Sequence, residues 1–222
     1  MKNLKIYFIL TAVTAVMLLV AGCKKAEDQY PSKTVPVTYP GIVLKGDSVV
    51  SITVGTPYTD AGATLIDDIS GAQSDIEATE NDVDVNTPGL YMVTYQASNA
   101  NGFTTIKQRP VAVTDVSATW DLSGNYQRTA NSVDVGVTKI ANGLYIIDNV
   151  GGVDPSSPQF IFPVYMAQLD DVTITIPAQV IADGTVLDCL DEELSAMPGD
   201  TSFTYVVDNV SFGTAPRTFA KQ

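Results

Sequence analysis

The sequence contains no histidine, and this absence excludes several classes of site at once. Ser-His-Asp and Cys-His catalytic groups need an imidazole base, so neither kind of enzyme is available to this chain. The only cysteines are Cys23 and Cys189, and without histidine they cannot supply the ligands of an ordinary zinc site. We therefore expect no metal and no cofactor.

Basic residues are also scarce. The chain has 12 Lys and Arg residues against 25 Asp and Glu residues, which gives a formal net charge of −13 at pH 7. Binding to nucleic acid depends on clustered cations that neutralise phosphates, so the charge argues against a nucleic-acid partner. With 222 residues, the chain is long enough for one large or two small domains with hydrophobic cores.

The N-terminal segment has the pattern of an export signal. Lys2 and Lys5 precede an apolar run over residues 6–20, and the tetrapeptide VAGC ends at Cys23. The run is too short for a stable transmembrane helix but suits a secretory signal. The tetrapeptide matches the bacterial lipobox, in which the cysteine is lipidated and becomes the first residue after cleavage. This predicts a signal peptide over residues 1–22 and a protein held at the membrane by lipid on Cys23.

Residues 23–40 contain recurring prolines and no periodic pattern, which predicts an extended tether after the lipid. Within it, Glu27-Asp28 resembles the short acidic export signals on surface lipoproteins of Bacteroidetes. The resemblance implies an outer-membrane lipoprotein that faces the cell exterior. Attachment to the inner face of the outer membrane is the alternative.

Cys189 has no partner for an intramolecular disulfide if Cys23 carries lipid. We expect Cys189 to be buried as a small apolar side chain. An intermolecular bridge or a reactive thiol is the alternative.

Residues 41–115 consist of short β-rich runs separated by turn residues. In the run over residues 90–97, Tyr91, Val93 and Tyr95 alternate with Leu90 and Met92, which is the period of a strand. Runs at this spacing predict a small antiparallel sandwich. The expected strands are residues 49–54, 63–66, 82–86, 90–97 and 104–113.

Three phrases in this half, at residues 54–63, 84–95 and 100–102, resemble a bacterial immunoglobulin-like domain family of surface proteins. The resemblance implies an Ig-like sandwich that serves as a spacer or an adhesive module. Tyr91 stands near a strand start, where a corner tyrosine bonds the backbone a few residues upstream. An ordinary core position is the alternative for Tyr91.

Residues 116–222 predict a second β domain, so that the whole chain is all-β. Asn142-Gly143 between two alternating runs predicts a hairpin, because both residues tolerate positive φ. Pro163 suggests an edge strand or a bulge, and residues 187–197 are the one place where a short helix fits. The pattern is that of a small antiparallel β-meander, either a barrel or a sandwich. The expected strands include residues 120–128, 133–138, 144–148, 160–169, 172–176, 202–207 and 218–221.

Phrases at residues 123–129, 137–148 and 168–177 resemble the C-terminal domains of Bacteroidetes surface lipoproteins that accompany polysaccharide-uptake systems. These domains are of unknown function and name no activity. The resemblance implies a glycan-associated accessory lipoprotein. Its expected partners are the membrane through the lipid anchor and either a polysaccharide or an envelope uptake complex.

Glycan binding normally uses aromatic rings that stack on sugars, and most aromatic residues of so small a fold must fill its core. Trp120, at the junction of the two halves, and Tyr165 are the candidate ligand-binding residues, with core or interdomain packing as the alternative. Glycoside hydrolysis needs two carboxyl groups across the scissile bond, whereas the adjacent acids Asp170 and Asp171 would face opposite sides of a strand. We therefore expect no catalytic activity.

Calcium is the one metal that acidic loops could attract. The acidic stretch that begins at Asp82 fails the EF-hand pattern, because Thr87 and Val93 stand where glycine and glutamate are needed. Asp60, Asp67 and Asp68 are the remaining candidates for a site between loops. Solvated acidic turns are the simpler interpretation.

These observations lead to a non-catalytic cell-envelope lipoprotein that carries a glycan-associated or adhesive domain on an Ig-like spacer. One alternative is a structural or assembly subunit that binds another envelope protein. A small-ligand carrier is the other, if the C-terminal meander encloses an apolar cavity.

Overall fold

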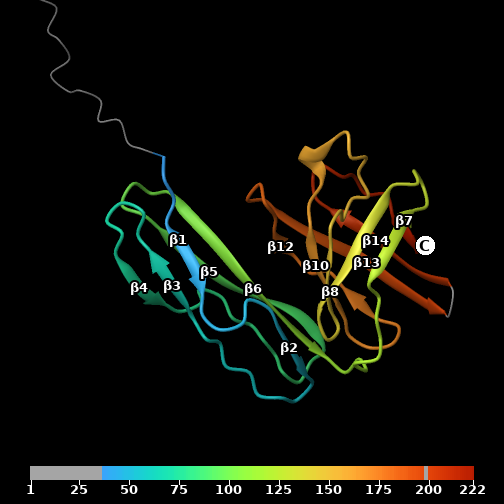
Figure 1. Cartoon of the computed structure of the whole chain (residues 1–222), viewed down its shortest axis with the longest axis horizontal. Coiled ribbons are helices and arrows are strands. Elements are labelled where there is room, and N and C mark those ends of the chain that lie inside the picture. Colours follow the sequence, from blue (N-terminus) through green and yellow to red (C-terminus); the bar gives the residue numbers. More distant parts are fainter. Residues whose placement is uncertain (1–36, 198–199) are drawn as a thin grey trace, which may run out of the picture. The chain divides into compact units, whose positions relative to one another are not determined.

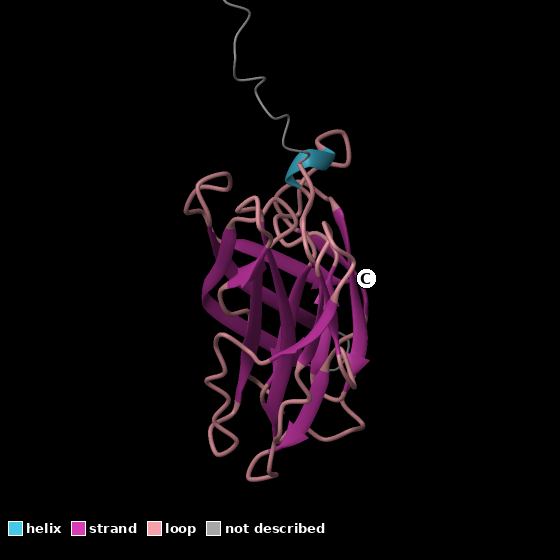
Figure 2. Cartoon of the chain, turned by 90° about the vertical axis from the view of Figure 1, so that its left-hand side faces the viewer, coloured by secondary structure: helices cyan, strands magenta, loops and turns pink. Residues whose placement is uncertain are grey.

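The computed structural model describes residues 37–197 and 200–222. The predicted signal peptide, the predicted lipidation site Cys23 and most of the predicted tether lie outside the described residues. Val37–Gln222 form one compact unit. In the described part of the chain, the regular elements are strands apart from one short 3-10 turn, η1 (Pro158–Phe160), as Figure 2 shows. No helix there has the length and apolar character needed to cross a bilayer. The predicted all-β class is confirmed.

The N-terminal half is a sandwich of two three-stranded sheets (Figure 1). One sheet has the order β1-β3-β4, with strands Gly41–Leu44, Ala63–Ile66 and Gln73–Ile76. The other has the order β2-β6-β5, with strands Val50–Thr53, Thr104–Thr114 and Gly89–Ser98, and β2 runs parallel to β6. The core between the sheets is centred on the buried residues Ala63, Val93, Tyr95 and Val111.

Tyr91 is a corner tyrosine, as its position near a strand start predicts. Its hydroxyl donates to the carbonyl of Thr87, four residues upstream, at 2.9 Å. The second half contains the same connection, because the Tyr126 hydroxyl donates to the Leu122 carbonyl at 2.8 Å. Each bond fixes how the chain enters the strand that follows.

Two expectations for this half are wrong. The sandwich is not wholly antiparallel, because β2 pairs with β6 in parallel over residues 50–53 and 111–114. Residues 82–86 form no strand, because the Asp84 carboxylate accepts bonds from the Asn86 N–H at 3.0 Å and the Thr87 hydroxyl at 2.7 Å, which makes a turn. The polar segment β4 is a strand that was not predicted. It forms because Gln73–Ile76 pairs with β3 at every position, and this pairing outweighs its weak β propensity.

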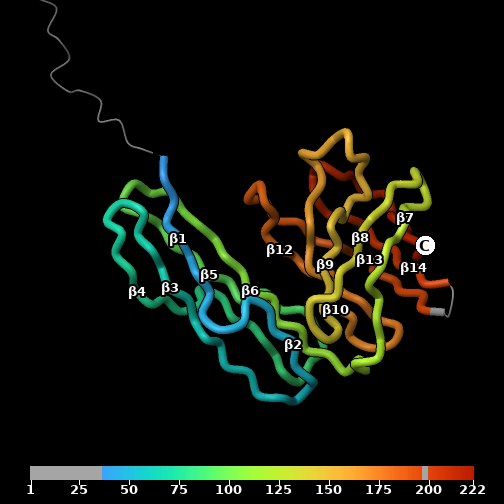
Figure 3. The backbone as a smooth tube through the Cα atoms, in the orientation of Figure 1, coloured from blue at the N-terminus to red at the C-terminus, as the bar shows by residue number. Residues whose placement is uncertain are grey.

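The C-terminal half is one antiparallel sheet in the order β11-β10-β9-β8-β7-β15-β14-β13-β12, and Figure 3 traces the chain through it. Its two edge strands, β11 and β12, are consecutive in the chain, so the sheet curls back on itself. Ile176, between these strands, contacts β13: the Cys189 N–H donates to its carbonyl at 3.2 Å, and the Glu192 carboxylate accepts its N–H at 3.0 Å. The strands are β7 (Gly124–Arg128), β8 (Asp134–Ala141), β9 (Leu144–Ile147), β10 (Val164–Gln168), β11 (Ile174–Thr175), β12 (Gln179–Val180), β13 (Val186–Met197), β14 (Asp200–Asp208) and β15 (Arg217–Lys221).

The interior of this curled sheet is filled by side chains. Phe203 lies at its centre and packs against Tyr126, Tyr205 and Phe219, with ring centroids 4.7, 5.8 and 5.2 Å away. Cys189 is free and buried in the same core, as predicted. Burial raises the pKa of its thiol, which disfavours the reactive thiolate. A small-ligand carrier would need an apolar cavity here, so the packed interior argues against that alternative.

The predicted helix at residues 187–197 is wrong, because this segment is the strand β13. Leu187 and Cys189 point into the core, and a bulge between Leu190 and Glu193 then shifts the register. Asp191 sits in this bulge with φ of 55°. The helix-forming residues of the segment have only a weak local preference, and pairing with β14 on both sides of the bulge outweighs it.

The hairpin at Asn142-Gly143 is confirmed. Of the two residues, Gly143 has positive φ, at 64°, and Asn142 does not. A register shift between Lys139 and Ala141 precedes the turn. A Cβ at position 143 would lie 2.8 Å from the Gln168 carbonyl oxygen, so the turn requires glycine.

The two halves share a small buried cluster. Leu90 and Ala112 come from the outer face of the β5–β6 pair, and Leu144 and Ala167 come from β9 and β10. The Thr114 hydroxyl also donates to the Gln168 carbonyl at 2.7 Å. The division of the chain into domains at residues 115 and 116 stays a prediction.

Candidate functional site

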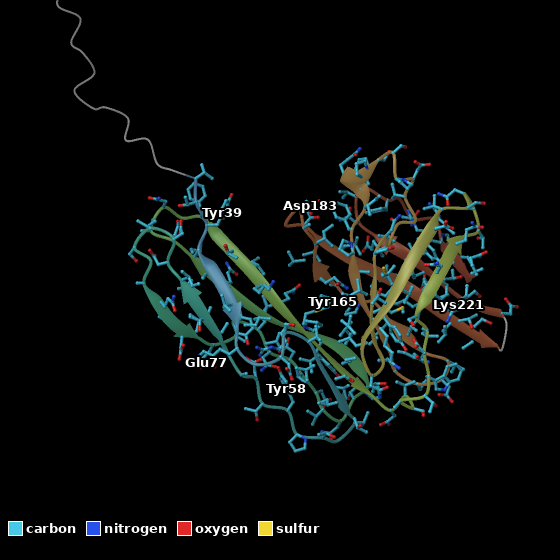
Figure 4. All side chains as sticks on the ribbon, in the orientation of Figure 1. Tyr39, Tyr58, Glu77, Tyr165, Asp183 and Lys221 are labelled. Atoms are coloured by element: carbon cyan, nitrogen blue, oxygen red, sulfur yellow. The ribbon has the colours of Figure 1, made fainter. Side chains whose placement is uncertain are left out.

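A groove lies beside the N-terminal end of β6. Its walls are that strand, Tyr165 of β10 and the hairpin that joins β12 to β13, and its volume is about 510 Å³. Figure 4 labels Tyr165 and, at the hairpin turn, Asp183. The lining residues are Thr104, Ile106, Lys107, Gln108, Tyr165, Gln179, Val180, Ile181, Ala182 and Gly184.

A second hollow of about 270 Å³ adjoins this groove. The two share four lining residues, which are Ile106, Gln108, Gln179 and Val180. The second hollow is further lined by Glu80, Thr94, Gln96, Ala178 and Val186. The Val180 N–H donates to the Gln108 side-chain oxygen at 2.9 Å, so a hydrogen bond joins two of the residues that both hollows share. We refer to the two adjoining hollows together as the groove.

Strand alternation explains why β6 contributes to this groove. Residues 104, 106, 108 and 112 share one face of the strand. Ala112 on this face is fully buried in the cluster between the halves, whereas Ile106, nearer the N-terminal end of the strand, is 41% exposed. On this face Ala112 is followed, toward the N-terminal end of the strand, by the polar residues Gln108 and Thr104. The part of the face outside the buried cluster is therefore polar.

Gln179 closes the curled sheet next to Tyr165. The strand β11 pairs only with Ala167 and Gln168 of β10, which leaves the edge at Tyr165 without a neighbouring strand. The Gln179 amide takes that place: its oxygen accepts the Tyr165 N–H at 2.8 Å, and its nitrogen donates to the Tyr165 carbonyl at 3.0 Å. The Gln179 side chain thus makes the two hydrogen bonds that a neighbouring strand would make, and these bonds hold the backbone of Tyr165 in place.

We expect Gln179→Leu to lower the free energy of unfolding by about 1–3 kcal/mol. Gln179 is 5% exposed, and leucine leaves the Tyr165 N–H and carbonyl without partners in a buried place. Urea unfolding monitored by circular dichroism measures the change. Gln96→Leu, at an exposed position on β5, is the matched control and should shift stability by less than about 0.5 kcal/mol. Equal stability of the two variants would contradict this role.

The hairpin that forms one wall of the groove is stabilised by hydrogen bonds within its own turn. Asp183 accepts bonds from the Thr185 hydroxyl at 2.7 Å and the Thr185 N–H at 2.9 Å. These two bonds lower the pKa of the Asp183 carboxyl below its ordinary value. The turn therefore stays closed with Asp183 charged.

The groove differs chemically from the rest of this acidic chain. The larger hollow has Lys107 and no carboxylate among its lining residues, and the smaller one has Glu80 alone. Side-chain amides and hydroxyls supply most of the polar groups, beside the Tyr165 ring and the exposed apolar side chain of Ile106. Such a surface offers hydrogen bonds in both directions and a flat face for stacking.

The structure places the two predicted ligand-binding residues apart. Tyr165 is half-buried: it packs against the cluster between the two halves, as the alternative of interdomain packing expects, and it also lines the larger hollow. Trp120 is half-buried and lines neither part of the groove; its carbonyl accepts a bond from the Lys139 ammonium at 2.6 Å. Sequence reasoning missed Gln108 and Gln179. Residues 104–108 are polar apart from Ile106, and this is the one local signal for the surface.

The three acids considered for calcium are engaged by different protein groups. Asp60 pairs with Arg109, and Asp67 accepts the Ser70 N–H at 2.6 Å within a turn. Asp68 accepts the side-chain amide of Asn99 at 3.1 Å. Among the residues with described positions, no three metal-ligating side chains gather closely enough to hold an ion.

The Asp60–Arg109 pair is the centre of a buried polar cluster inside the Ig-like sandwich. Arg109 is 1% exposed and donates to the Asp60 carboxylate, to the Tyr95 hydroxyl at 3.0 Å and to the Gly62 carbonyl at 3.2 Å. Burial, and then the bond to Asp60 at 2.8 Å, raises the pKa of Tyr58 to about 12. Because these groups bond one another, we interpret the cluster as part of the structural framework of the Ig-like sandwich.

Comparison with known proteins identifies the first half of the chain. Residues 42–113 match the family described as bacterial surface protein, Ig-like domain. A crystal structure of the lipoprotein BT2262 from Bacteroides thetaiotaomicron is similar at 24% sequence identity, over 82% of this chain and 100% of that one. Its TM-score is 0.37. No curated protein matches the chain. Residues 42–113 are thus a bacterial surface Ig-like domain, and the chain fits an accessory protein of the cell envelope.

Proposed function

We propose that the protein is a non-catalytic lipoprotein of the outer membrane, anchored through Cys23, exposed on the cell surface and able to bind polysaccharide. The observation that carries the proposal is the groove in which the Tyr165 ring lies among side-chain amides and hydroxyls. In this arrangement the Ig-like domain holds one wall of the groove, through β6, and also spaces the site from the membrane.

The composition of the groove suits a sugar ligand. Carbohydrates present hydroxyl groups that both donate and accept, and the exposed amide side chain of Gln96 does the same. The Gln108 amide bonds Thr94 and Val180 and orders the wall between the hollows. Their apolar faces stack on aromatic rings, and Tyr165 is the one ring among the lining residues. A few fixed polar groups around an apolar contact are the usual composition of a binding site.

The same groove supports binding more than hydrolysis. Glycosidases place two carboxyl groups about 5–10 Å apart across the scissile bond. Glu80 is the single carboxylate among the residues that line the two hollows. With one acid, the groove has no acid–base pair for this chemistry.

Affinity electrophoresis of the full chain in mild detergent tests the proposal, with gels that contain single polysaccharides. We expect retardation in at least one gel, and we expect Tyr165→Ala to abolish it because the stacking surface is lost. Tyr39→Ala is the matched control, because Tyr39 is 57% exposed and lies outside the groove. Unchanged retardation of Tyr165→Ala, or no retardation of the unaltered chain in any gel, would contradict the proposal.

The lipid anchor has its own test. We expect Cys23→Ala to move the protein from the detergent phase to the aqueous phase in detergent partitioning of expressing cells, because the cysteine that carries the acyl chains is gone. Cys189→Ala is the control, since Cys189 is buried in the core and should leave partitioning unchanged. Detergent-phase partitioning of Cys23→Ala would contradict anchoring at this residue.

A structural or assembly role is the second candidate, and one observation favours it. Val37, Tyr39 and Ile69 are 68%, 57% and 52% exposed. They lie near a common point, because the Asn99 amide donates to both the Thr38 carbonyl and the Asp68 carboxylate. Exposed apolar side chains that gather in this way often contact another protein. Absence of retardation in every gel would favour this role.

A further inference from the structure

We propose that the groove binds the internal part of a linear, neutral polysaccharide across two subsites, one in each of the adjoining hollows. The inference rests on the proposed function and specifies the ligand of the same groove. The first subsite is the larger hollow at Tyr165. The second is the smaller hollow at Gln96 and Val186.

The geometry favours a chain that passes through over one that ends inside. The two hollows share Ile106, Gln108, Gln179 and Val180. Exposed residues line both of them: Thr104 and Gly184 in the first subsite, and Gln96 and Val186, which pair with Ile106 and Val180, in the second. Sites that select a chain end enclose it with a buried wall, and these exposed residues leave both subsites open.

The backbone edges at Tyr165 and Val180 disfavour an extended peptide. A peptide would add as a strand by pairing with free N–H and carbonyl groups. Here the Tyr165 N–H and carbonyl are paired with the Gln179 amide, and the Val180 N–H is paired with Gln108. A sugar chain needs no such edge, because it bonds side chains through its hydroxyl groups.

The charges favour a neutral chain. Glu80 is the one carboxylate that lines the groove, whereas the Lys107 side chain lies on the opposite face of β6, where it pairs with Tyr95. A repeating acidic polysaccharide would meet Glu80 and the −13 net charge of the whole chain. A neutral polysaccharide is repelled neither by Glu80 nor by the net charge of the chain.

The test uses the full chain in detergent and gels of unbranched neutral glucans, mannans and galactans, with an acidic polysaccharide as a further arm. We expect retardation by a neutral polymer to be lost in Tyr165→Ala and weakened roughly fivefold in Gln96→Ala, the effect of about one hydrogen bond. Val186→Ser should weaken it as well, and Tyr39→Ala should leave it unchanged. Because Gln96 and Val186 are exposed, their variants should keep the native circular dichroism spectrum.

The outcomes separate this inference from the proposed function. Wild-type retardation of both Gln96→Ala and Val186→Ser, with loss in Tyr165→Ala, would overturn the second subsite and leave polysaccharide binding in place. Retardation by the acidic polymer alone would overturn the neutral ligand. Competition by a disaccharide at the concentration at which a longer oligosaccharide competes would overturn the two-subsite mode. Absence of retardation in every gel would overturn both proposals.

Discussion

Asp60→Asn will lower the free energy of unfolding by about 3–5 kcal/mol, because it leaves the buried Arg109 guanidinium without its counter-charge. The side chains of Arg109 and Asp60 are 1% and 9% exposed, so water cannot replace the lost carboxylate. Urea unfolding followed by circular dichroism measures the change. Asp60 also accepts the Tyr58 and Tyr95 hydroxyls, and these bonds weaken with it.

The chain contains a matched control for this prediction. Asp75 pairs with Lys45 at 2.7 Å, but the two side chains are 75% and 39% exposed. Asp75→Asn should therefore change stability by no more than about 1 kcal/mol. The double variant Asp60→Asn/Arg109→Met should be more stable than Asp60→Asn alone, because it removes the uncompensated charge. Equal effects of Asp60→Asn and Asp75→Asn would show that burial does not strengthen the pair.

The pH dependence of stability follows from the same cluster. Burial alone would raise the pKa of Asp60, but the bonds from Tyr95, Tyr58 and the Gly62 N–H, with the charge of Arg109, lower it below its ordinary value of 3.8. A lowered pKa means that this contribution is present above pH 3.8 and is lost as the pH falls through the folded-state value. Asp60→Asn should lack this part of the acid destabilisation.

Phe203→Ala is the second substitution with a large expected effect: it should lower the free energy of unfolding by about 3–5 kcal/mol. Phe203 is 1% exposed and packs against three other rings, so the shortened side chain leaves a cavity at the centre of the curled sheet. Urea unfolding measures this loss, with Trp120 fluorescence as a second probe.

Phe160→Ala is the control for this cavity, because Phe160 is 41% exposed in the turn η1 and contributes little buried area. Its effect should stay within about 0.5–1 kcal/mol. A loss below about 1 kcal/mol for Phe203→Ala would contradict the tightly packed interior. It would also reopen the small-ligand alternative.

The sequence predicts this fold best where local chemistry and long-range pairing agree. Residues 63–66 are a short, mostly apolar run that stands between Gly62 and Asp67-Asp68, and the strand has these limits in the structure. Residues 187–197 combine helix-forming side chains with a bulge, and their strand is set by β14, which no local pattern shows. Curling of the sheet likewise depends on contacts of Ile176 and Gln179 with residues distant in the chain.

The site was predictable only in part for a related physical reason. Tyr165 was selected as an aromatic residue in the second half of the chain, and the structure places it in the groove. Trp120 was selected on the same reasoning and lies elsewhere. The glutamines matter through partners on other strands, so Gln108 and Gln179 cannot be recognised until the pairing of β6, β10 and β12 is known.

The central claim is that polysaccharide binds along β6 and the β12–β13 hairpin. Hydrogen–deuterium exchange of the full chain, with and without the polysaccharide that retards it, tests this most directly. We expect the added protection to fall on residues 104–108 and 179–184 and to disappear in Tyr165→Ala. Protection confined to other segments, or none upon saturation with the polysaccharide, would contradict the claim.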